Sequence, residues 1–485
     1  MKRTLLAVAV FAPILLASPA AAIRSAPEPF CVRHLALDLA IDFPGQRLSG
    51  TATCELENRT AQPASDVSLL LNRLMEASQV RDASGKFVRF TQDVVRFRDM
   101  PMRQVTQVRV HLPRPVAPGA RTTLRLSYAG NLVGNTDIGW NYVRDHIDTS
   151  FTILREEPCA FPVVAGLSDS ANRAVASPDF TYDVSIRVPA PYVVAVGGTP
   201  SQQSHPDGTT SWRYVCRTPV PFLNVCIARY AMAREGDVRV FYFPADSAGA
   251  RKLMAGAQAA MRTFGEWFGP LHRRPDLCIS EIPDGWGSQA DADAGIIQSA
   301  AAFRDAQRLN ELYHELSHLW NAPDTDAPSP RWNEGLATFL ELLMFERLDG
   351  WTRRAAFDSA RIVRLRAKLA REPGLANVPF IDYGKRDMTG ESYSVGAIMF
   401  EILHDLDVDA FHRIVGGYYQ KYPDGATTRD FVAFARAAGP PAVAPVLEDW
   451  LLSTRWTQII ASSTSVSDFV RHYRELGGAQ PSSPR

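Results

Sequence analysis

The stretch LYHELSHLWNAP, Leu312 to Pro323, places two histidines and a glutamate within five consecutive residues. Apolar residues recur around it at positions 309, 312, 313, 316, 319 and 320, which predicts a helix with one face in a core. His314 and His318 lie four apart on another face, so their rings project side by side from consecutive turns. Two neutral imidazoles so placed can share one zinc ion, and Glu315 lies where its carboxylate can reach a water on that metal. Alone, the two histidines are only suggestive of a metal site, because they can lie one turn apart by chance, and a third ligand is needed.

A candidate third ligand follows in SPRWNEGLATFLELLMFERLDG, residues 329–350. Ser329 and Pro330 are typical of a helix start, and Gly350 of a helix end. Glu334 lies in the first turn, where the helix dipole favours a carboxylate whatever its role. The intervening loop is long enough to fold this helix back on the first. Two histidines and a glutamate would leave the fourth zinc position open for water, as in catalytic rather than structural zinc sites.

HELSH followed by WNEG resembles the gluzincin metallopeptidases, and more narrowly the aminopeptidase N family, which also includes leukotriene hydrolases. Residues 391–436, beginning ESYSVGAIMF, are similar to the family's helical segment that carries a catalytic tyrosine, and the match puts Tyr393 in that role. The region ending in FLNVCIARYAMA, residues 222–233, resembles the family's N-terminal sandwich. The resemblance covers nearly all of the chain after residue 22.

The chain also departs from the family's pattern. Residues 319–333 place fifteen residues between His318 and Glu334, where the family usually has eighteen, so the rim of the cleft must differ. Ser394 and Val395 follow Tyr393, without the family's usual lysine.

The family's G-x-M-E-N strand, whose glutamate binds the free amine of the substrate, has no clean counterpart here. Its expected place is DGWGSQADADAGIIQSAAAF, where Asp291 or Asp293 could replace that carboxylate. Glu156 or Glu157 in LREEPCAFP could supply the partner from the N-terminal domain. For each of the four, the alternative is a solvated surface acid.

Period-two alternation of apolar residues between about residues 30 and 230 predicts a sandwich of antiparallel sheets. The first convincing helix covers residues 247–269, and helical patterns dominate from residue 305 onward. With the resemblance, the expected fold is an N-terminal antiparallel β-sandwich followed by a thermolysin-like α+β catalytic domain with a helical C-terminal end. The expected divisions are a signal peptide (1–22), the sandwich (23–233), the zinc peptidase domain (234–460) and a short helix with a disordered tail (461–485).

The first 22 residues, with a basic start, an apolar run and three final alanines, are typical of a cleaved signal peptide and predict export, to the periplasm or as a secreted protein. No later stretch is apolar enough to predict stable membrane insertion. Lysine plus arginine number 52, as do aspartate plus glutamate, so no basic face for nucleic acid is expected. Six cysteines in an exported chain predict disulfides, with Cys31–Cys54 and Cys216–Cys226 preferred among fifteen possible connectivities.

The predicted function is a zinc-dependent peptide-bond hydrolase, an aminopeptidase acting on peptides, with a metal-activated water as nucleophile. One Zn²⁺ per chain would be held by His314, His318 and Glu334, with Glu315 as general base and Tyr393 donating to the oxyanion. Two alternatives remain: a catalytically weak relative that binds peptides, and a zinc hydrolase of a non-peptide substrate such as an epoxide. Side-chain preference, exo- versus endopeptidase action and oligomeric state are not predicted.

Overall fold

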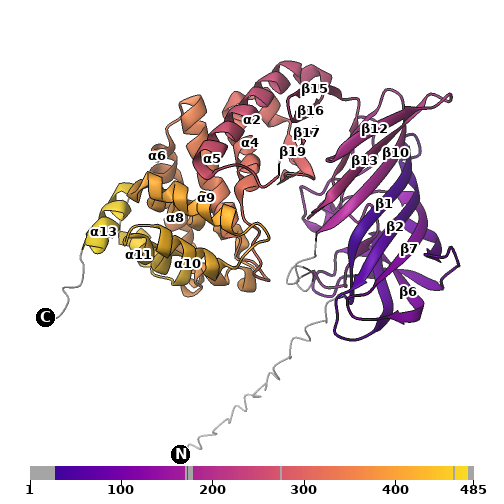
Figure 1. Ribbon diagram of the computed structural model, residues 1–485, viewed down its shortest axis with the longest axis horizontal. Coiled ribbons are helices and arrows are strands. Elements are labelled where there is room, and N and C mark those ends of the chain that lie inside the picture. The colour runs from indigo at the N-terminus through magenta and orange to yellow at the C-terminus, as the bar shows by residue number, and fades with distance from the viewer. Residues whose placement is uncertain (1–27, 170–171, 173–178, 274–275, 463–464, 479–485) are drawn as a thin grey trace, which may run out of the picture.

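The computed structural model describes residues 28–169, 172, 179–273, 276–462 and 465–478. The predicted signal peptide and residues 479–485 of the predicted tail lie outside them. A β-sheet-rich N-terminal part and a helical C-terminal part lie on opposite sides of the molecule in Figure 1, which confirms this division of the predicted fold. Within the described ranges, no helix is both long and apolar enough to span a bilayer.

The N-terminal part is built on two sheets that share one core. The larger has the strand order β12-β13-β10-β1-β2-β7-β4, and the smaller has the order β5-β6-β3-β9. Alternate residues are buried along most of β1 and β2, as the period-two pattern predicts, whereas residues 67–72 of β3 are all buried. Leu37 of β1 and Leu69 of β3 both belong to the shared core. The strands of the larger sheet are β1 (Phe30–Asp42), β2 (Arg47–Asn58), β4 (Met75–Asp82), β7 (Arg121–Asn131), β10 (Phe180–Pro189), β12 (Thr199–Ser204) and β13 (Thr209–Val220). The smaller sheet has β3 (Ala64–Asn72), β5 (Phe90–Arg96), β6 (Gln104–Val116) and β9 (Val163–Val164).

The prediction of an antiparallel sandwich needs one correction, because β1 and β10 pair in parallel. Parallel neighbours require a long crossover connection. The whole smaller sheet and three strands of the larger one, β2, β4 and β7, lie between these two strands in sequence, so the chain has room to return in the same direction. A further three-stranded sheet, in the order β11-β14-β8, comprises β8 (Phe151–Leu154), β11 (Val193–Ala195) and β14 (Val225–Ala228).

All six cysteines are buried free thiols, so the two predicted disulfides are wrong. Sheet register explains the first pair. In the β1–β2 ladder Cys31 lies opposite Glu57, and Cys54 lies opposite Leu35, so the two thiols are four residues apart along the strands. A disulfide needs Cα atoms within about 7 Å, which this register does not provide.

The second predicted pair fails because the two strands belong to different sheets. Cys216 lies on β13 of the seven-stranded sheet, whereas Cys226 lies on β14 of the three-stranded sheet. Adjacency in the sequence did not make these strands partners.

A five-stranded mixed sheet begins the C-terminal part, with the order β15-β16-β17-β19-β18. Its first strand includes the predicted domain boundary at residues 233 and 234. The edge strand β18 runs antiparallel to β19 and packs against the helix that carries the histidines. The strands are β15 (Ala231–Glu235), β16 (Val238–Tyr242), β17 (Leu277–Ile282), β18 (Gln289–Asp291) and β19 (Gly295–Ser299).

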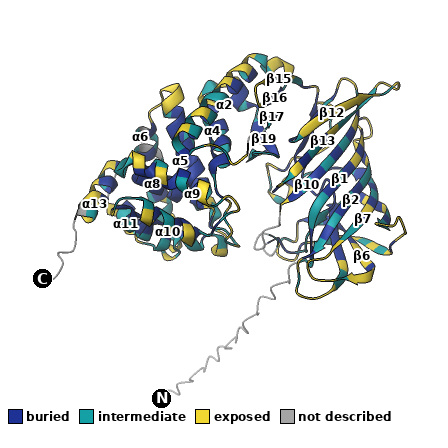
Figure 2. Ribbon diagram, in the orientation of Figure 1, coloured by how far each residue is buried: buried dark blue, intermediate teal, exposed yellow. Residues whose placement is uncertain are grey.

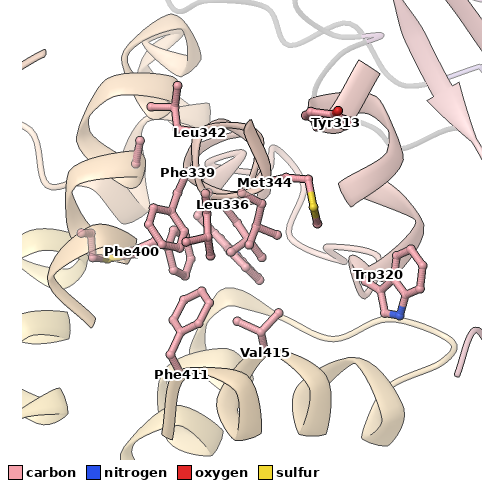
Figure 3. Close-up of a cluster of buried hydrophobic side chains, with 14 of the residues drawn as sticks. Tyr313, Trp320, Leu336, Phe339, Leu342, Met344, Phe400, Phe411 and Val415 are labelled. Atoms are coloured by element: carbon pink, nitrogen blue, oxygen red, sulfur yellow. The ribbon is translucent and has the colours of Figure 1, made fainter. Parts of the chain in front are cut away.

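One helix, α5 (Trp332–Asp349), forms the centre of the helical part. It is apolar on nearly every face, and accordingly it is buried on nearly every face, as a central helix should be. Figure 2 shows the buried residues concentrated where the helices meet, and Figure 3 shows Leu336 and Phe339 of α5 close to Phe400, with Phe411 facing them. The surrounding helices are α2 (Ser247–Phe268), α3 (Ala301–Arg304), α4 (Leu309–Ser317), α6 (Arg353–Ala355), α7 (Val363–Arg371), α8 (Ser392–Leu406), α9 (Val408–Lys421), α10 (Thr428–Ala438) and α11 (Val443–Leu447).

Two helices end the described chain, α12 (Trp456–Ser462) and α13 (Val466–Gly478). They dock on the helical part through buried aromatic side chains. The indole Nε1 of Trp450 donates to the hydroxyl of Tyr473 at 3.0 Å, and both rings are fully buried. The short helix predicted after residue 460 therefore belongs to the same core.

Candidate active site

The two histidines lie at the end of α4, which the chain continues as a single 3-10 turn, η4 (His318–Trp320). The apolar face predicted for this helix is buried: Leu309, Leu312 and Leu316 lie in the core. The opposite face carries His314 and His318, whose ring centroids are 5.0 Å apart. The predicted helix and its orientation are therefore both present.

Glu334 comes from the first turn of α5, which begins at Trp332, two residues later than the sequence suggests. Ser329 explains the delay, because its hydroxyl accepts the backbone N–H of Arg331 and forms a local turn. Arg331 then takes a left-handed conformation (φ 56°) immediately before the helix. The loop after η4 thereby brings α5 back against α4, as predicted from its length.

The structure brings the three predicted zinc ligands together. One side-chain atom from each of His314, His318 and Glu334 lies within 4.8 Å of the other two. Oε2 of Glu334 lies 3.3 Å from Nε2 of His314 and 3.6 Å from Nε2 of His318. Both rings thus present the same nitrogen to the same carboxylate oxygen.

Two residues that the sequence analysis did not identify hold the other ring nitrogens. Oε2 of Glu341 lies 2.9 Å from Nδ1 of His314. The side-chain amide of Asn321 lies 2.8 Å from Nδ1 of His318, and its oxygen is buried with no hydrogen-bond partner among the described residues. Rotated about its Cβ–Cγ bond, this amide accepts from the Nδ1–H. With Nδ1 protonated on both rings, the two Nε2 lone pairs are free for a metal, so the residues present fit zinc.

The electrostatics of the cluster also favour a cation. Burial alone would raise the pKa of Glu334, but the two adjacent imidazoles and the charge of Arg331 outweigh it and hold that pKa well below its usual range. Burial raises the pKa of Glu315. Glu315, Glu334 and Glu341 place three carboxyl groups around two imidazoles, a donor set suited to a divalent metal.

Tyr393 lies on the first turn of α8, beside the histidines. Its ring is parallel to that of His314 within 12°, with centroids 6.2 Å apart. Burial, with a contribution from Glu334, raises the pKa of Tyr393 to about 12, so its hydroxyl remains a hydrogen-bond donor at neutral pH.

The placement of Tyr393 depends on close approach of α5 and α8. A Cβ on Gly335 would lie 2.5 Å from the Cα of Gly396, and a Cβ on Gly396 would lie 2.8 Å from the Cα of Gly335. Such distances are too short for real side chains, so both positions need glycine. The hydroxyl of Ser392 also donates to the carbonyl of Pro330 at 2.7 Å, which fixes the start of α8 beside the loop before α5.

The four acidic residues considered for amine binding have different surroundings. Asp291 accepts the backbone N–H groups of Asp293 and Ala294 within the β18–β19 turn. Asp293 lies 3.6 Å from Arg273. Glu157 accepts from Nε2 of Gln289 on β18 at 2.9 Å, which joins the N-terminal part to the edge strand.

Glu156 and Glu157 line a cavity of about 580 Å³ between the sandwich and β18. Trp140, Tyr142 and Phe161 supply aromatic walls, and Gln289 closes the side nearest β18. Because β18 packs against α4 and η4, the cavity is next to the strand that flanks the two histidines.

Comparison with solved structures identifies the architecture. An M1 zinc metallopeptidase from Deinococcus radiodurans superposes with a TM-score of 0.63 at 21% sequence identity, over 88% of this chain and 95% of that one. The chain has the fold of the two-domain M1 zinc metallopeptidases. No protein-family model and no curated protein matches the sequence.

Two further M1 structures are of glutamate-to-alanine mutants with bound molecules. One, from the same organism, holds a Tyr-Ser-Ala substrate and matches with a TM-score of 0.61 at 20% identity, over 88% of this chain and 95% of that one. The other, described as a two-domain enzyme, holds L-arginine and matches with a TM-score of 0.62 at 20% identity, over 90% of this chain and 95% of that one.

Proposed function

We propose that this protein is a zinc-dependent peptidase that removes the first residue from peptides with a free amino terminus. The observation that carries the proposal is the convergence of His314, His318 and Glu334 within 4.8 Å. Glu315 lies next to His314 on α4, and the ring of Tyr393 stacks with that of His314. The fold shared with the two-domain M1 zinc metallopeptidases supports the proposal. A thermolysin-like arrangement of the C-terminal part is a further part of the proposal.

His314 and His318 would hold zinc through Nε2 and Glu334 through Oε2. When bound, zinc supplies a water whose pKa is lowered to about 7 and a positive charge that polarises the scissile carbonyl. Glu341 and Asn321 hold the two rings in the orientation that this set needs. Their contacts leave no ring nitrogen of the pair without a role.

Glu315 and Tyr393 carry the proton and charge chemistry of the chain itself. The carboxylate of Glu315 takes a proton from the attacking water and passes it to the leaving amine. The hydroxyl of Tyr393 donates to the oxyanion that develops on the carbonyl oxygen, an interaction made chiefly in the transition state. Its raised pKa keeps the proton needed for that hydrogen bond.

Glu157 is our choice for the residue that binds the substrate's ammonium group. Its hydrogen bond with Gln289 places a carboxylate at the edge strand, whereas Asp291 is committed to a turn. Asp293 remains a predicted alternative beside Arg273. The neighbouring M1 structures that hold Tyr-Ser-Ala and L-arginine support a site for short peptides and amino acids.

We also propose that the chain is exported, on the pattern of its first 22 residues, and reaches the periplasm or the outside of the cell. The free state of the six thiols adds no support to this proposal.

A peptide-library digest tests the proposed function. Zinc-loaded protein is incubated with matched libraries that carry free or acetylated amino termini, and products are read by mass spectrometry. The expected result is stepwise loss of first residues from the free library alone, abolished by Glu315→Gln. Cleavage of both libraries would make the enzyme an endopeptidase. Cleavage of neither, with zinc bound, would favour a peptide-binding relative or a non-peptide substrate, which an epoxide hydrolysis assay then separates.

A further inference from the structure

The cavity beside β18 contains a carboxyl group that has no counter-charge among the described residues. Glu156 lines this cavity, and its carboxyl group makes no hydrogen bond or ion pair within the part of the chain that the structure describes. Its neighbour Glu157 shares its sign and is engaged by Gln289. Burial, with a contribution from Glu157, raises the pKa of Glu156 to about 8. A carboxyl group in such surroundings is stabilised by any cation that enters.

Two arginines line the same cavity. One is paired with another carboxylate, and the other does not act on Glu156. Nη1 of Arg103 lies 2.9 Å from Asp169, and its guanidinium stacks over Phe97 and Trp140. Arg59 is an exposed residue whose charge acts on Cys31, and it does not contribute to the pKa of Glu156. Among the described residues, therefore, no arginine that lines the cavity neutralises Glu156.

The walls of the cavity suit a long side chain with a charged end. Trp140, Tyr142 and Phe161 offer aromatic surface on which methylene groups pack, and the ring of Tyr142 has a face that also attracts a cation. The volume of about 580 Å³ is ample for one lysine or arginine side chain.

The cavity is placed to receive the first side chain of a bound peptide. Gln289 lines the cavity and belongs to β18. Its side-chain amide donates to Glu157, the residue proposed to bind the substrate's ammonium group. Glu156 lines the same cavity as Glu157, and the charge of Glu157 acts on its carboxyl group. An amino acid whose ammonium is held at Glu157 would therefore have its side chain beside Glu156.

We propose that this cavity binds the first side chain of the substrate and that Glu156 selects a long cationic one, lysine or arginine. This inference rests on the proposed aminopeptidase function and adds the class of amino acid that it removes. Glu156 acts as a specificity residue, while Glu157 binds the ammonium group common to all substrates.

The hydrolysis test compares fluorogenic amides of lysine and norleucine, which differ chiefly in the terminal ammonium. We expect wild-type kcat/KM to favour lysine by at least about tenfold and Glu156→Gln to lose that preference. Glu156→Asp should retain part of it, and Glu76→Gln, an exposed residue of β4, should leave the ratio unchanged. A wild-type ratio near one, or a ratio that Glu156→Gln does not alter, overturns the inference.

A binding measurement separates this inference from the proposed function. Calorimetry with Glu315→Gln compares the affinities of L-lysine amide and L-norleucine amide, with and without Glu156→Gln in the same chain. Selective binding of the lysine amide that depends on Glu156 supports the inference even if no amide is hydrolysed, in which case the proposed function alone fails. Equal binding of the two amides overturns the inference whatever the enzyme hydrolyses.

Discussion

Oε2 of Glu341 lies 2.9 Å from Nδ1 of His314, and Glu341 follows Glu334 by seven residues on the same helix. Seven residues are almost two helical turns, so both carboxyl groups project from one face of α5 toward the same imidazole. One helix thereby supplies both a proposed metal ligand and the acceptor that orients another ligand. The position of α5 against α4 sets the geometry of the whole cluster.

Replacing Glu341 should weaken zinc binding without removing a ligand. We expect Glu341→Ala to lower zinc affinity by about 10–100-fold, because the imidazole of His314 loses the acceptor that fixes its tautomer and ring orientation. Competition with a chromophoric chelator measures the affinity. The zinc affinity of Glu341→Gln, which keeps an oxygen acceptor, should lie between those of wild type and Glu341→Ala. Glu448→Ala, a substitution on the surface, serves as the control. Unchanged affinity in Glu341→Ala would remove this residue from the site.

Glu315→Gln should keep zinc and lose nearly all hydrolysis. The amide has almost the same size as the carboxylate, but it cannot take a proton from water. Zinc content and kcat/KM are measured on one preparation. Activity within a few-fold of wild type would show that another group is the base.

Tyr393→Phe should lower kcat by roughly 10²–10³-fold with little change in KM, because an oxyanion donor acts mainly in the transition state. The ring that stacks with His314 is retained in this variant, so zinc affinity should not change. Steady-state kinetics separate the two parameters. If KM alone rises, Tyr393 binds substrate and does not stabilise the transition state.

Glu281 should make the protein less stable as pH rises. Burial of this β17 residue, with a contribution from Asp246, raises its pKa from 4.5 to about 8. The N–H of Phe243, which Oε2 accepts, and the charge of Arg304 oppose this rise by smaller amounts. The folded state therefore holds the proton up to about pH 8, while an unfolded glutamate loses it near pH 4.5. The free energy of unfolding should fall across that window, by up to about 1.4 kcal/mol per pH unit.

Urea unfolding of wild type and Glu281→Gln, from about pH 5 to about pH 9, measures this effect. The variant lacks the titration, so its stability relative to wild type should increase with pH and level off above about pH 8. Both proteins share the metal site, whose own pH dependence cancels in the difference. A difference independent of pH would contradict the raised pKa.

The parts of the site that the sequence predicted are those encoded locally. His314, Glu315 and His318 lie on one short helix, and helical periodicity alone sets their relative positions. Glu334 required only that a loop be long enough to return. Helical periodicity also places Glu341 on the same face of α5 as Glu334, two turns further on. Its contact with His314, however, depends on how α5 packs against α4.

The features that the sequence did not predict depend on pairing between distant segments. The ladder register of β1 and β2 decides that Cys31 and Cys54 cannot meet, and no local pattern contains that register. The hydrogen bond between Glu157 and Gln289 joins residues 132 apart in the chain. The cavity that Glu156 lines combines residues far apart in the sequence, from Glu28 to Gln289.

Metal analysis tests the central claim, that His314, His318 and Glu334 hold a catalytic zinc ion. Atomic emission on purified wild type should give about one zinc per chain, and peptide hydrolysis should disappear on chelation and return with added zinc. His318→Ala, measured in the same way, should lose most of the metal and the activity together. Full zinc content in His318→Ala, or hydrolysis by wild type stripped of zinc, would contradict the account.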